Sequence, residues 1–238
     1  MEIATDPAEL TPVAQDYLKA VWSAQEWSDE KVTTKHLADR LGVGASTVSE
    51  TVRRLCGQGL LEHERYGAIR LTDDGRRLAL VMVRRHRLLE TFLVDQLGYG
   101  WDEVHDEAEV LEHAVSDVFV ERMAERLGNP TRDPHGDPIP SADGTVVRPD
   151  AVPLSSMHAG DAGTVVRISD ADPDALRYLA ELGLDLDMRV EVTTRREFAG
   201  TVAVTWTCPA PGSDRDGANE RMADLGLLAA SRVWVSRG

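Results

Sequence analysis

Cysteine is scarce in this sequence, which contains only Cys56 and Cys208 among 238 residues. The two cysteines lie far apart and neither belongs to a CxxC pair, which argues against a disulfide framework and against a structural zinc site. Cys56 follows Val48, Val52 and Leu55 at helical spacing. We therefore predict that it is a small core residue rather than a reactive thiol.

Long apolar runs are also absent. No stretch approaches the roughly 18 apolar residues that a membrane-spanning helix needs, and the acidic residues 1–9 do not resemble a signal peptide. We therefore expect a cytoplasmic protein without a membrane partner. A chain of 238 residues predicts two or three domains of modest size.

Basic side chains are in the minority, with 26 lysines and arginines against 41 acidic residues and a net charge of −15. This balance argues against indiscriminate binding to nucleic acids. The charge is unevenly distributed, however. Residues 31–77 contain nine basic and six acidic side chains, whereas residues 101–126 contain nine acidic side chains and two arginines. A local DNA-binding region is therefore compatible with the acidic total.

Residues 33–60 have the pattern of two helices joined by a tight turn at 42–45. Thr47, with Glu50 three residues later, fits a capping box at the start of the second helix. Its outward face carries small hydroxyls and then arginines, as a recognition helix in a major groove requires. Short strands at 60–65 and 68–71, around Tyr66-Gly67, predict a wing. A helical hairpin without a role in DNA binding is the alternative. The candidate DNA-binding residues are Ser46, Thr47, Ser49, Glu50 and Arg53.

Acidic groups and histidines gather along a helix predicted over residues 102–127. Its apolar residues recur at helical spacing, at Val104, Ala108, Leu111 and Val115. That register places Glu109, Glu112 and His113 on one face. Such groups would repel and desolvate one another without a cation, so they indicate a divalent metal; a solvated acidic face is the alternative.

Two further helices carry possible partners for this face. A helix predicted from the Thr72–Gly75 start to Leu97 places His86 and Glu90 one turn apart, with His105 potentially near them. Thr11-Pro12 is the expected start of a second helix, which runs to Glu26. This helix holds Asp16 beside its apolar stripe, where a carboxylate needs a partner. A favourable interaction of Asp16 with the helix dipole is the alternative. The long helix has two apolar faces, which predicts a homodimer.

The C-terminal part is predicted to be a separate β domain. Six of the 26 residues from 128 to 153 are proline, so we interpret this segment as a linker. Strand-like runs follow at 164–168, 189–193, 202–207 and 232–235, with a helix at 173–182. This pattern is typical of a small, partly open β-barrel.

Three motifs stand out in the sequence. They are RRHRLLE at 84–90, VHDEAE at 104–109 continuing to Glu112-His113, and DPHGDPIP at 133–140. Together they resemble the diphtheria toxin repressor family of metal-dependent transcriptional regulators, in its manganese-responsive branch of actinobacterial type. The resemblance implies a multidomain α+β protein. The expected domains are a winged helix-turn-helix over 1–75, a helical dimerisation and metal-binding domain over 76–128, a Pro-rich linker over 129–154 and an SH3-like β-barrel over 155–238.

The same resemblance implies two metal sites in each subunit. The primary, activating site would fall on Asp16, Glu109, Glu112 and His113. The ancillary site would fall on His86, Glu90, His105 and Asp172. A second ligand from the SH3-like domain, usually glutamine, aligns with Ala175, and Asp170 or Asp174 could substitute for it.

The resemblance also indicates the metal. The iron-responsive branch has methionine at the place of Asp16 and cysteine at the place of Glu109, whereas two carboxylates suit Mn²⁺. We therefore expect a manganese-activated repressor, without enzymatic activity or a small organic substrate, that binds palindromic operator DNA as a dimer and controls metal homeostasis genes. An iron-responsive (Fe²⁺) regulator and a metal-independent winged-helix regulator of a small ligand are the alternatives. A carboxylate-bridged di-metal oxidase would need Glu-x-x-His on two helices. In Glu109-x-x-Glu112 a glutamate stands where that motif needs the histidine.

Overall fold

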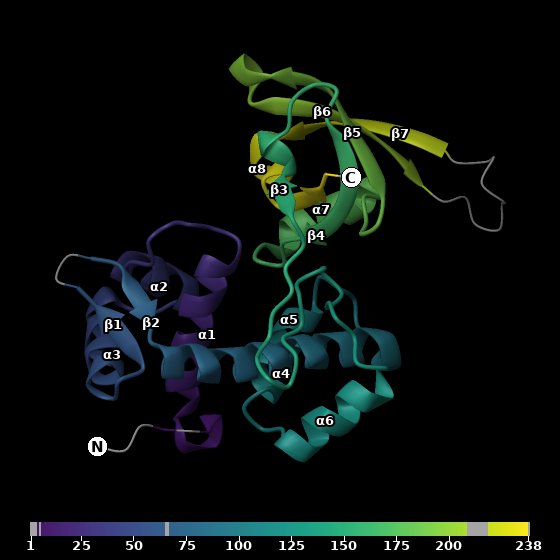
Figure 1. The fold of residues 1–238 in the computed structure, drawn as a ribbon. Helices are drawn as coiled ribbons and strands as arrows, with labels where there is room; N and C mark the ends of the chain where they lie inside the picture. Colours follow the sequence, from purple (N-terminus) through teal and green to yellow (C-terminus); the bar gives the residue numbers. More distant parts are fainter. Residues whose placement is uncertain (1–3, 5, 65–66, 209–218, 238) are drawn as a thin grey trace. The chain divides into compact units, whose positions relative to one another are not determined.

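The computed structural model describes residues 4, 6–64, 67–208 and 219–237, and the chain forms two compact units (Figure 1). The first comprises residues up to 89 together with 109–131 and 139–146. The second comprises residues 90–108, 132–138 and the chain from 147 onward. None of the described helices combines the length and apolarity needed to cross a membrane.

The first unit begins with a short 3₁₀ helix, η1 (Pro7–Glu9), and helix α1 (Pro12–Glu26). The Thr11 hydroxyl accepts a hydrogen bond from the Ala14 amide at 3.3 Å, which satisfies one of the free N–H groups at the helix start. The predicted start and end of this helix are therefore confirmed. Its apolar side is buried against α2, α3 and the two-stranded wing in one core.

Helices α2 (Thr34–Leu41) and α3 (Ala45–Gly57) form the predicted helix-turn-helix. Gly42 ends α2 with φ of 65°, a left-handed conformation that glycine adopts without strain. The capping box predicted at Thr47 is wrong, because Gly44 is the N-cap of α3 and makes no side-chain cap. The sharp turn around glycine starts the helix early enough to place Thr47 and Glu50 inside it.

The wing consists of strands β1 (Leu61–His63) and β2 (Ile69–Leu71), which pair antiparallel with Leu61 opposite Leu71. Both are shorter than the predicted strands. Tyr66 of the predicted turn lies outside the described residues, whereas Gly67 is described.

Helix α4 (Asp73–Leu97) confirms the predicted long helix. The single helix predicted over 102–127 is wrong, because the chain forms α5 (Val104–Leu111) and α6 (Asp117–Arg126) instead. The amides of Ala114 and Val115 both bond to the Leu111 carbonyl, which closes α5. The Ser116 hydroxyl then accepts a bond from the Phe119 amide at 3.3 Å and starts α6. Glu112 and His113 therefore lie in the turn after α5.

The second unit contains one antiparallel sheet in the order β3-β8-β4-β5-β6-β7, with β3 and β7 at its open edges (Figure 1). Apolar side chains from the sheet and from the helices η2, α7 and α8 form a single core. The prediction missed both edge strands and recovered the other four strands and the helix. The strands are β3 (Ala151–Pro153), β4 (Ala162–Ile168), β5 (Arg189–Arg196), β6 (Thr201–Cys208), β7 (Asn219–Gly226) and β8 (Val233–Ser236). The helices are η2 (Leu154–Ser156), α7 (Pro173–Leu182), η3 (Glu197–Ala199) and α8 (Leu227–Ala230).

The Pro-rich segment contains buried residues, which a free linker would not have. The side chains of Asp133, His135 and Asp137 are at most 5% exposed. Arg132 and Pro138 form an isolated antiparallel bridge around a tight turn, and Gly136 adopts φ of 90° within it. A Cβ at Gly136 would lie 2.1 Å from the Val166 carbonyl oxygen, so the turn packs directly on β4. The domain boundaries themselves stay a prediction.

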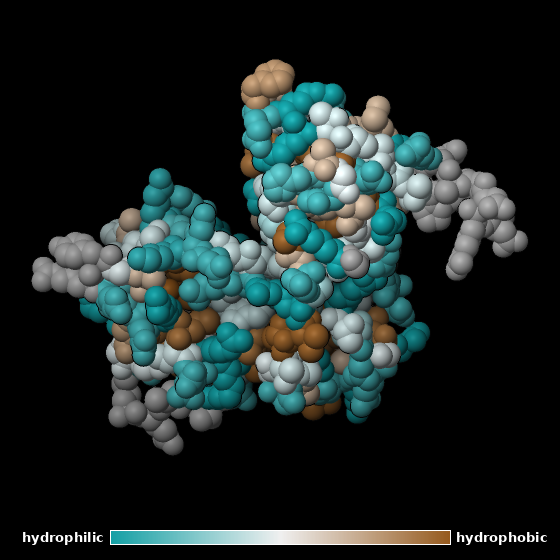
Figure 2. Space-filling model, turned by 45° about the horizontal axis from the view of Figure 1, so that its top comes forward, coloured by the Kyte–Doolittle hydropathy of each residue, from teal (hydrophilic) through white to brown (hydrophobic). Residues whose placement is uncertain are grey.

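Exposed apolar side chains gather on α5 and α6. Val110 is 70% exposed, Val118 64% and Phe119 46%. The visible face of the molecule is otherwise largely hydrophilic, with a few brown apolar patches (Figure 2). Single exposed apolar residues are ordinary, but three on adjacent elements indicate a surface suited to a partner.

The contact between the start of α4 and the wing predicts a strong effect of Gly75→Ala. A Cβ at Gly75 would lie 1.9 Å from the Leu60 carbonyl oxygen, a backbone atom that cannot move away cheaply. We expect the free energy of unfolding to fall by about 3 kcal/mol. Gly57→Ala is the control, because nothing lies within 4 Å of its Cβ position. Urea unfolding of both variants checks this, and equal stabilities would contradict it.

Candidate metal centre and nucleic-acid interface

The most deeply buried acid of the first unit is Glu112, whose side chain is 0% exposed. Its Oε1 accepts a hydrogen bond from Lys19 Nζ at 2.6 Å, and its Oε2 lies 2.6 Å from His86 Nδ1. Lys19 Nζ also donates to Glu109 Oε1 at 2.7 Å. Glu109 on α5 is thus held by Lys19 from α1, and Glu112 in the turn after α5 is held by Lys19 and by His86 from α4.

His113 and Asp16 lie on the other side of the same cluster. Nε2 of His113 is 2.9 Å from Asp16 Oδ1 and 3.7 Å from Glu112 Oε1. Nδ1 of His113 is 2.7 Å from Gln15 Oε1, and because that oxygen only accepts, the proton lies on Nδ1. The amide nitrogen of Gln15 is held in turn by the Pro7 carbonyl oxygen at 2.7 Å. The Nε2 lone pair of a neutral His113 therefore faces Asp16 and Glu112.

The environment of Asp16 favours a cation. Its Oδ1 is buried and makes no bond of hydrogen-bond geometry, although His113 lies close. Burial raises the pKa of the Asp16 carboxyl, and Glu109 and Glu112 raise it further, although His113 and Lys19 oppose this. One donor atom from each of Asp16, Glu112 and His113 fits within 4.8 Å of the others, as does one from each of His86, Glu109 and Glu112. Both groups are suited to a metal ion.

Lys19 and Gln15 are the residues of this centre that the sequence did not reveal. Lys19 falls one turn after Asp16, so helical spacing could have placed it on the same face. A lysine on a helix is usually solvent-exposed, and a glutamine followed by an aspartate does not match any motif of a metal site. Only the packing of α1 shows that the Lys19 side chain is 10% exposed and surrounded by carboxylates.

A second cluster lies within the second unit. His105 Nδ1 is 3.1 Å from Glu90 Oε1 and 3.2 Å from Asp170 Oδ2. Burial lowers the pKa of His105, but the bonds to Asp170 and Glu90 outweigh it and raise the pKa from 6.5 to about 10. His86 stands one turn before Glu90 on α4, where its Nδ1 contacts Glu112.

Asp170 and Asp172 are close in sequence but have different roles. Asp172 is the N-cap of α7, where its Oδ1 accepts bonds from the Asp174 and Ala175 amides at 3.1 and 3.3 Å. Asp170, two residues earlier, is the carboxylate that faces His105. The structure therefore favours Asp170 as the donor from this segment, and the assignment of Asp172 stays a prediction.

The predicted DNA-binding side chains lie along the exposed side of α3. Ser46, Thr47, Ser49, Glu50 and Arg53 are all exposed, while Val48, Val52 and Leu55 are buried. The Ser49 hydroxyl donates to the Ala45 carbonyl at 2.9 Å, which leaves its oxygen as an acceptor. The helix thus presents hydroxyls, a carboxylate and a guanidinium to solvent, as a recognition helix needs.

Comparison with known proteins agrees with this arrangement. The model of the N-terminal DNA-binding domain of iron-dependent repressors matches residues 9–69, and that of their metal-binding and dimerisation domain matches residues 72–141. The FeoA domain model matches residues 152–237. The chain belongs to the iron-dependent repressor family. This family is also named after one of its members, the diphtheria toxin repressor. Members of this family are metal-dependent transcriptional repressors rather than enzymes.

Relatives cover most of the chain. The iron-dependent repressor IdeR of Mycobacterium tuberculosis H37Rv is 34% identical over 82% of this chain and 90% of its own length. The diphtheria toxin repressor of Corynebacterium efficiens is 30% identical over 83% of this chain and 88% of its own length. A solved manganese-dependent transcriptional repressor in complex with manganese is 59% identical, covers 94% of this chain and 100% of its own, and superposes with a TM-score of 0.88. The multidomain α+β fold predicted for this repressor is therefore confirmed.

The position of Lys19 predicts that the metal-free repressor depends on its ammonium. Lys19→Met would leave the buried Glu112 carboxylate beside Glu109 without that cation. We expect the free energy of unfolding without metal to fall by about 3 kcal/mol, as when one partner of a buried pair is removed. Lys35→Met is the control, because Lys35 is an exposed residue of α2, and this change should alter stability by under about 0.5 kcal/mol. Denaturant unfolding in chelator measures both, and an unchanged Lys19 variant would contradict the role of the ammonium.

Proposed function

We propose that this chain is a manganese-activated repressor that binds palindromic operator DNA as a homodimer and controls metal homeostasis genes. The observation that carries the proposal is the donor set of the first unit. Asp16, Glu112 and His113 bring donor atoms within 4.8 Å of one another, and Glu109 meets Glu112 and His86 in the same way. The proposed set of Asp16, Glu109, Glu112 and His113 therefore has three carboxylates, one imidazole and no sulfur. Oxygen-rich sets with one imidazole suit Mn²⁺, whereas thiolate or thioether ligands favour softer metals.

The fit of a metal to these residues is supported by three features. The buried Oδ1 of Asp16 has no hydrogen bond. Gln15 holds His113 in the tautomer whose Nε2 can act as a ligand, a common arrangement around metal-bound histidines. Glu112 and Glu109 already hold a cation, the Lys19 ammonium. A bound divalent ion would supply positive charge and directional bonds to this set.

The mechanism follows from the positions of the donors in the chain. Asp16 belongs to α1, which shares its core with α2, α3 and the wing. Glu109 is on α5, and Glu112 and His113 follow it. Asp16 from one part and Glu109, Glu112 and His113 from the other would hold the metal together, and α1 and the recognition helix would then be fixed relative to the turn after α5. A 100-fold gain in operator affinity requires about 2.7 kcal/mol of coupling, which is within the usual range for allostery.

Dimerisation is proposed to use α5 and α6, where Val110, Val118 and Phe119 are exposed. A fixed spacing between two copies of α3 then matches two half-sites of a palindrome. We further propose an ancillary metal site that uses Glu90, His105 and Asp170, with His86 contributing from the preceding turn of α4. Asp170 there replaces the predicted Asp172.

Iron responsiveness is the second candidate function, because IdeR, an iron-dependent repressor, is 34% identical to this chain. Anaerobic titrations of a duplex selected from a random pool, with Mn²⁺ or Fe²⁺ at buffered free concentrations, decide between the two. We expect Mn²⁺ to activate at the lower free concentration. The double substitution Asp16→Met with Glu109→Cys should reduce or reverse this preference, because it makes the ligand set softer. Equal activation of the native protein by both metals would contradict the assignment to manganese.

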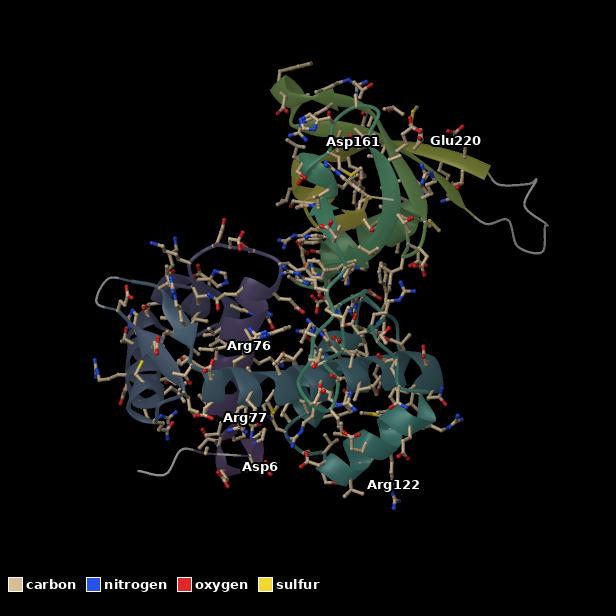
Figure 3. All side chains as sticks on the ribbon, in the orientation of Figure 1. Asp6, Arg76, Arg77, Arg122, Asp161 and Glu220 are labelled. Atoms are coloured by element: carbon tan, nitrogen blue, oxygen red, sulfur yellow. The ribbon has the colours of Figure 1, made fainter. Side chains whose placement is uncertain are left out.

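The exposed α3 predicts a phosphate contact at Arg53. Arg53→Ala should weaken binding to specific and unrelated duplexes alike and lower the slope of log affinity against log salt by about 0.9. Arg189→Ala is the control, since this arginine is exposed on β5 of the second unit, the unit that also carries Asp161 and Glu220 (Figure 3). Fluorescence anisotropy at several salt concentrations measures the slopes. An unchanged slope for Arg53→Ala would remove this side chain from the DNA interface.

A further inference from the structure

A third group of donors lies in the second unit, where the Pro-rich turn packs on β4. It consists of Glu90, Asp133 and His135, whose donor atoms all lie within 4.8 Å of one another. The three residues are 1%, 5% and 0% exposed. Glu90 is shared with the His105 and Asp170 cluster, whereas Asp133 and His135 are not part of that group.

His135 is oriented in the way that a metal-binding histidine requires. Its Nε2 lies 2.6 Å from the Trp101 carbonyl oxygen. A carbonyl only accepts, so the ring proton of the neutral imidazole is on Nε2 and its lone pair is on Nδ1. The ring also stacks on Trp101, with centroids 5.9 Å apart and planes 19° apart. These two contacts fix both the tautomer and the orientation of the ring.

The lone pair on Nδ1 has no partner, because this nitrogen is buried and makes no hydrogen bond. An unsatisfied buried polar atom is unfavourable, so a native structure that keeps one calls for an explanation. The carboxylates of Glu90, Asp133 and Asp170 all lie close enough to interact electrostatically with the His135 ring. The surroundings of the ring therefore attract positive charge.

Asp133 is held by the turn itself. Its Oδ1 accepts hydrogen bonds from the His135 and Asp137 amides, both at 2.9 Å. The bond between the Ile168 amide and the His135 carbonyl, at 2.8 Å, ties the turn to β4. Asp133 and His135 are thus positioned by backbone contacts before any ion arrives, and this preorganisation favours binding.

We infer that Glu90, Asp133 and His135 hold a divalent cation through His135 Nδ1, at a position next to the His105 cluster and bridged to it by Glu90. Two carboxylates and one imidazole suit a hard or borderline ion such as Mn²⁺. The Pro-rich turn is then a metal-binding element of the chain. This inference does not depend on which metal activates the repressor.

The test counts Mn²⁺ bound to the full-length protein by equilibrium dialysis at fixed free Mn²⁺, followed by elemental analysis. His135→Phe keeps an aromatic ring against Trp101 and removes the lone pair. Asp133→Asn keeps the oxygen that accepts the two amides and removes the charge. We expect each variant to bind one ion fewer per chain than the native protein. His158→Phe is the control, because the His158 side chain is 81% exposed.

Double variants separate this position from its neighbours. His135→Phe combined with Asp133→Asn should still lose one ion, whereas His135→Phe combined with His105→Phe should lose two. Asp16→Asn tests the first centre independently, because its effect on the count should add to that of Asp133→Asn. Failure of Asp16→Asn to change the count would therefore challenge the proposed function without touching this inference.

Two results would overturn the inference. One is an unchanged ion count in both His135→Phe and Asp133→Asn. The other is a loss of only one ion when His135 and His105 are replaced together, which would make His135 a ligand of the His105 ion. Thermal unfolding in chelator confirms that each variant is folded, and Asp133→Asn with His105→Phe carries the test if His135→Phe does not fold.

Discussion

The buried carboxylate of Glu112 is the constraint on which the first unit depends. A carboxylate that is 0% exposed cannot stay ionised without nearby positive charge or hydrogen-bond donors. Lys19 from α1 and His86 from α4 meet it at 2.6 Å each. The cost of leaving this charge unpaired therefore ties three elements together. Since α1 shares a core with the recognition helix, a change in what neutralises Glu112 is also a change in the support of α3.

The sequence predicted the parts of the fold whose local signals agree with their packing. Thr11-Pro12 starts α1 as expected. Glu109 and Glu112 do approach each other, but Glu112 and His113 lie in the turn after α5 and not on the helical face that their spacing suggested. The break between α5 and α6 was missed because apolar residues continue at helical spacing to Val115, across the turn. Ser116 alone is a weak signal for a new helix, and only the bonds that close α5 on Leu111 show the interruption.

Composition was a poor guide to the Pro-rich segment and to the sheet edge. Proline and glycine predict exposed, irregular chain, yet the turn around Gly136 is buried against β4. Strand β7 begins with Asn219, Glu220 and Arg221, which are poor strand formers, and it is held by pairing along the whole of β6. The resemblance placed a ligand of the ancillary site at Asp172, whereas Asp170 is the carboxylate that faces His105. Pro173 after Asp172 marks a helix start, and the structure shows the capping role that this implies.

The charge balance of the proposed first centre suits a divalent ion. Asp16, Glu109 and Glu112 contribute three negative charges when ionised, and Lys19 contributes one positive charge, so with neutral imidazoles the group carries −2. A divalent cation neutralises that charge, whereas a monovalent ion leaves a buried carboxylate uncompensated. Affinity alone would still favour zinc or copper over manganese. Selectivity must therefore come from coordination number and geometry, which are set by how far α1 and the turn after α5 can approach each other around the ammonium of Lys19.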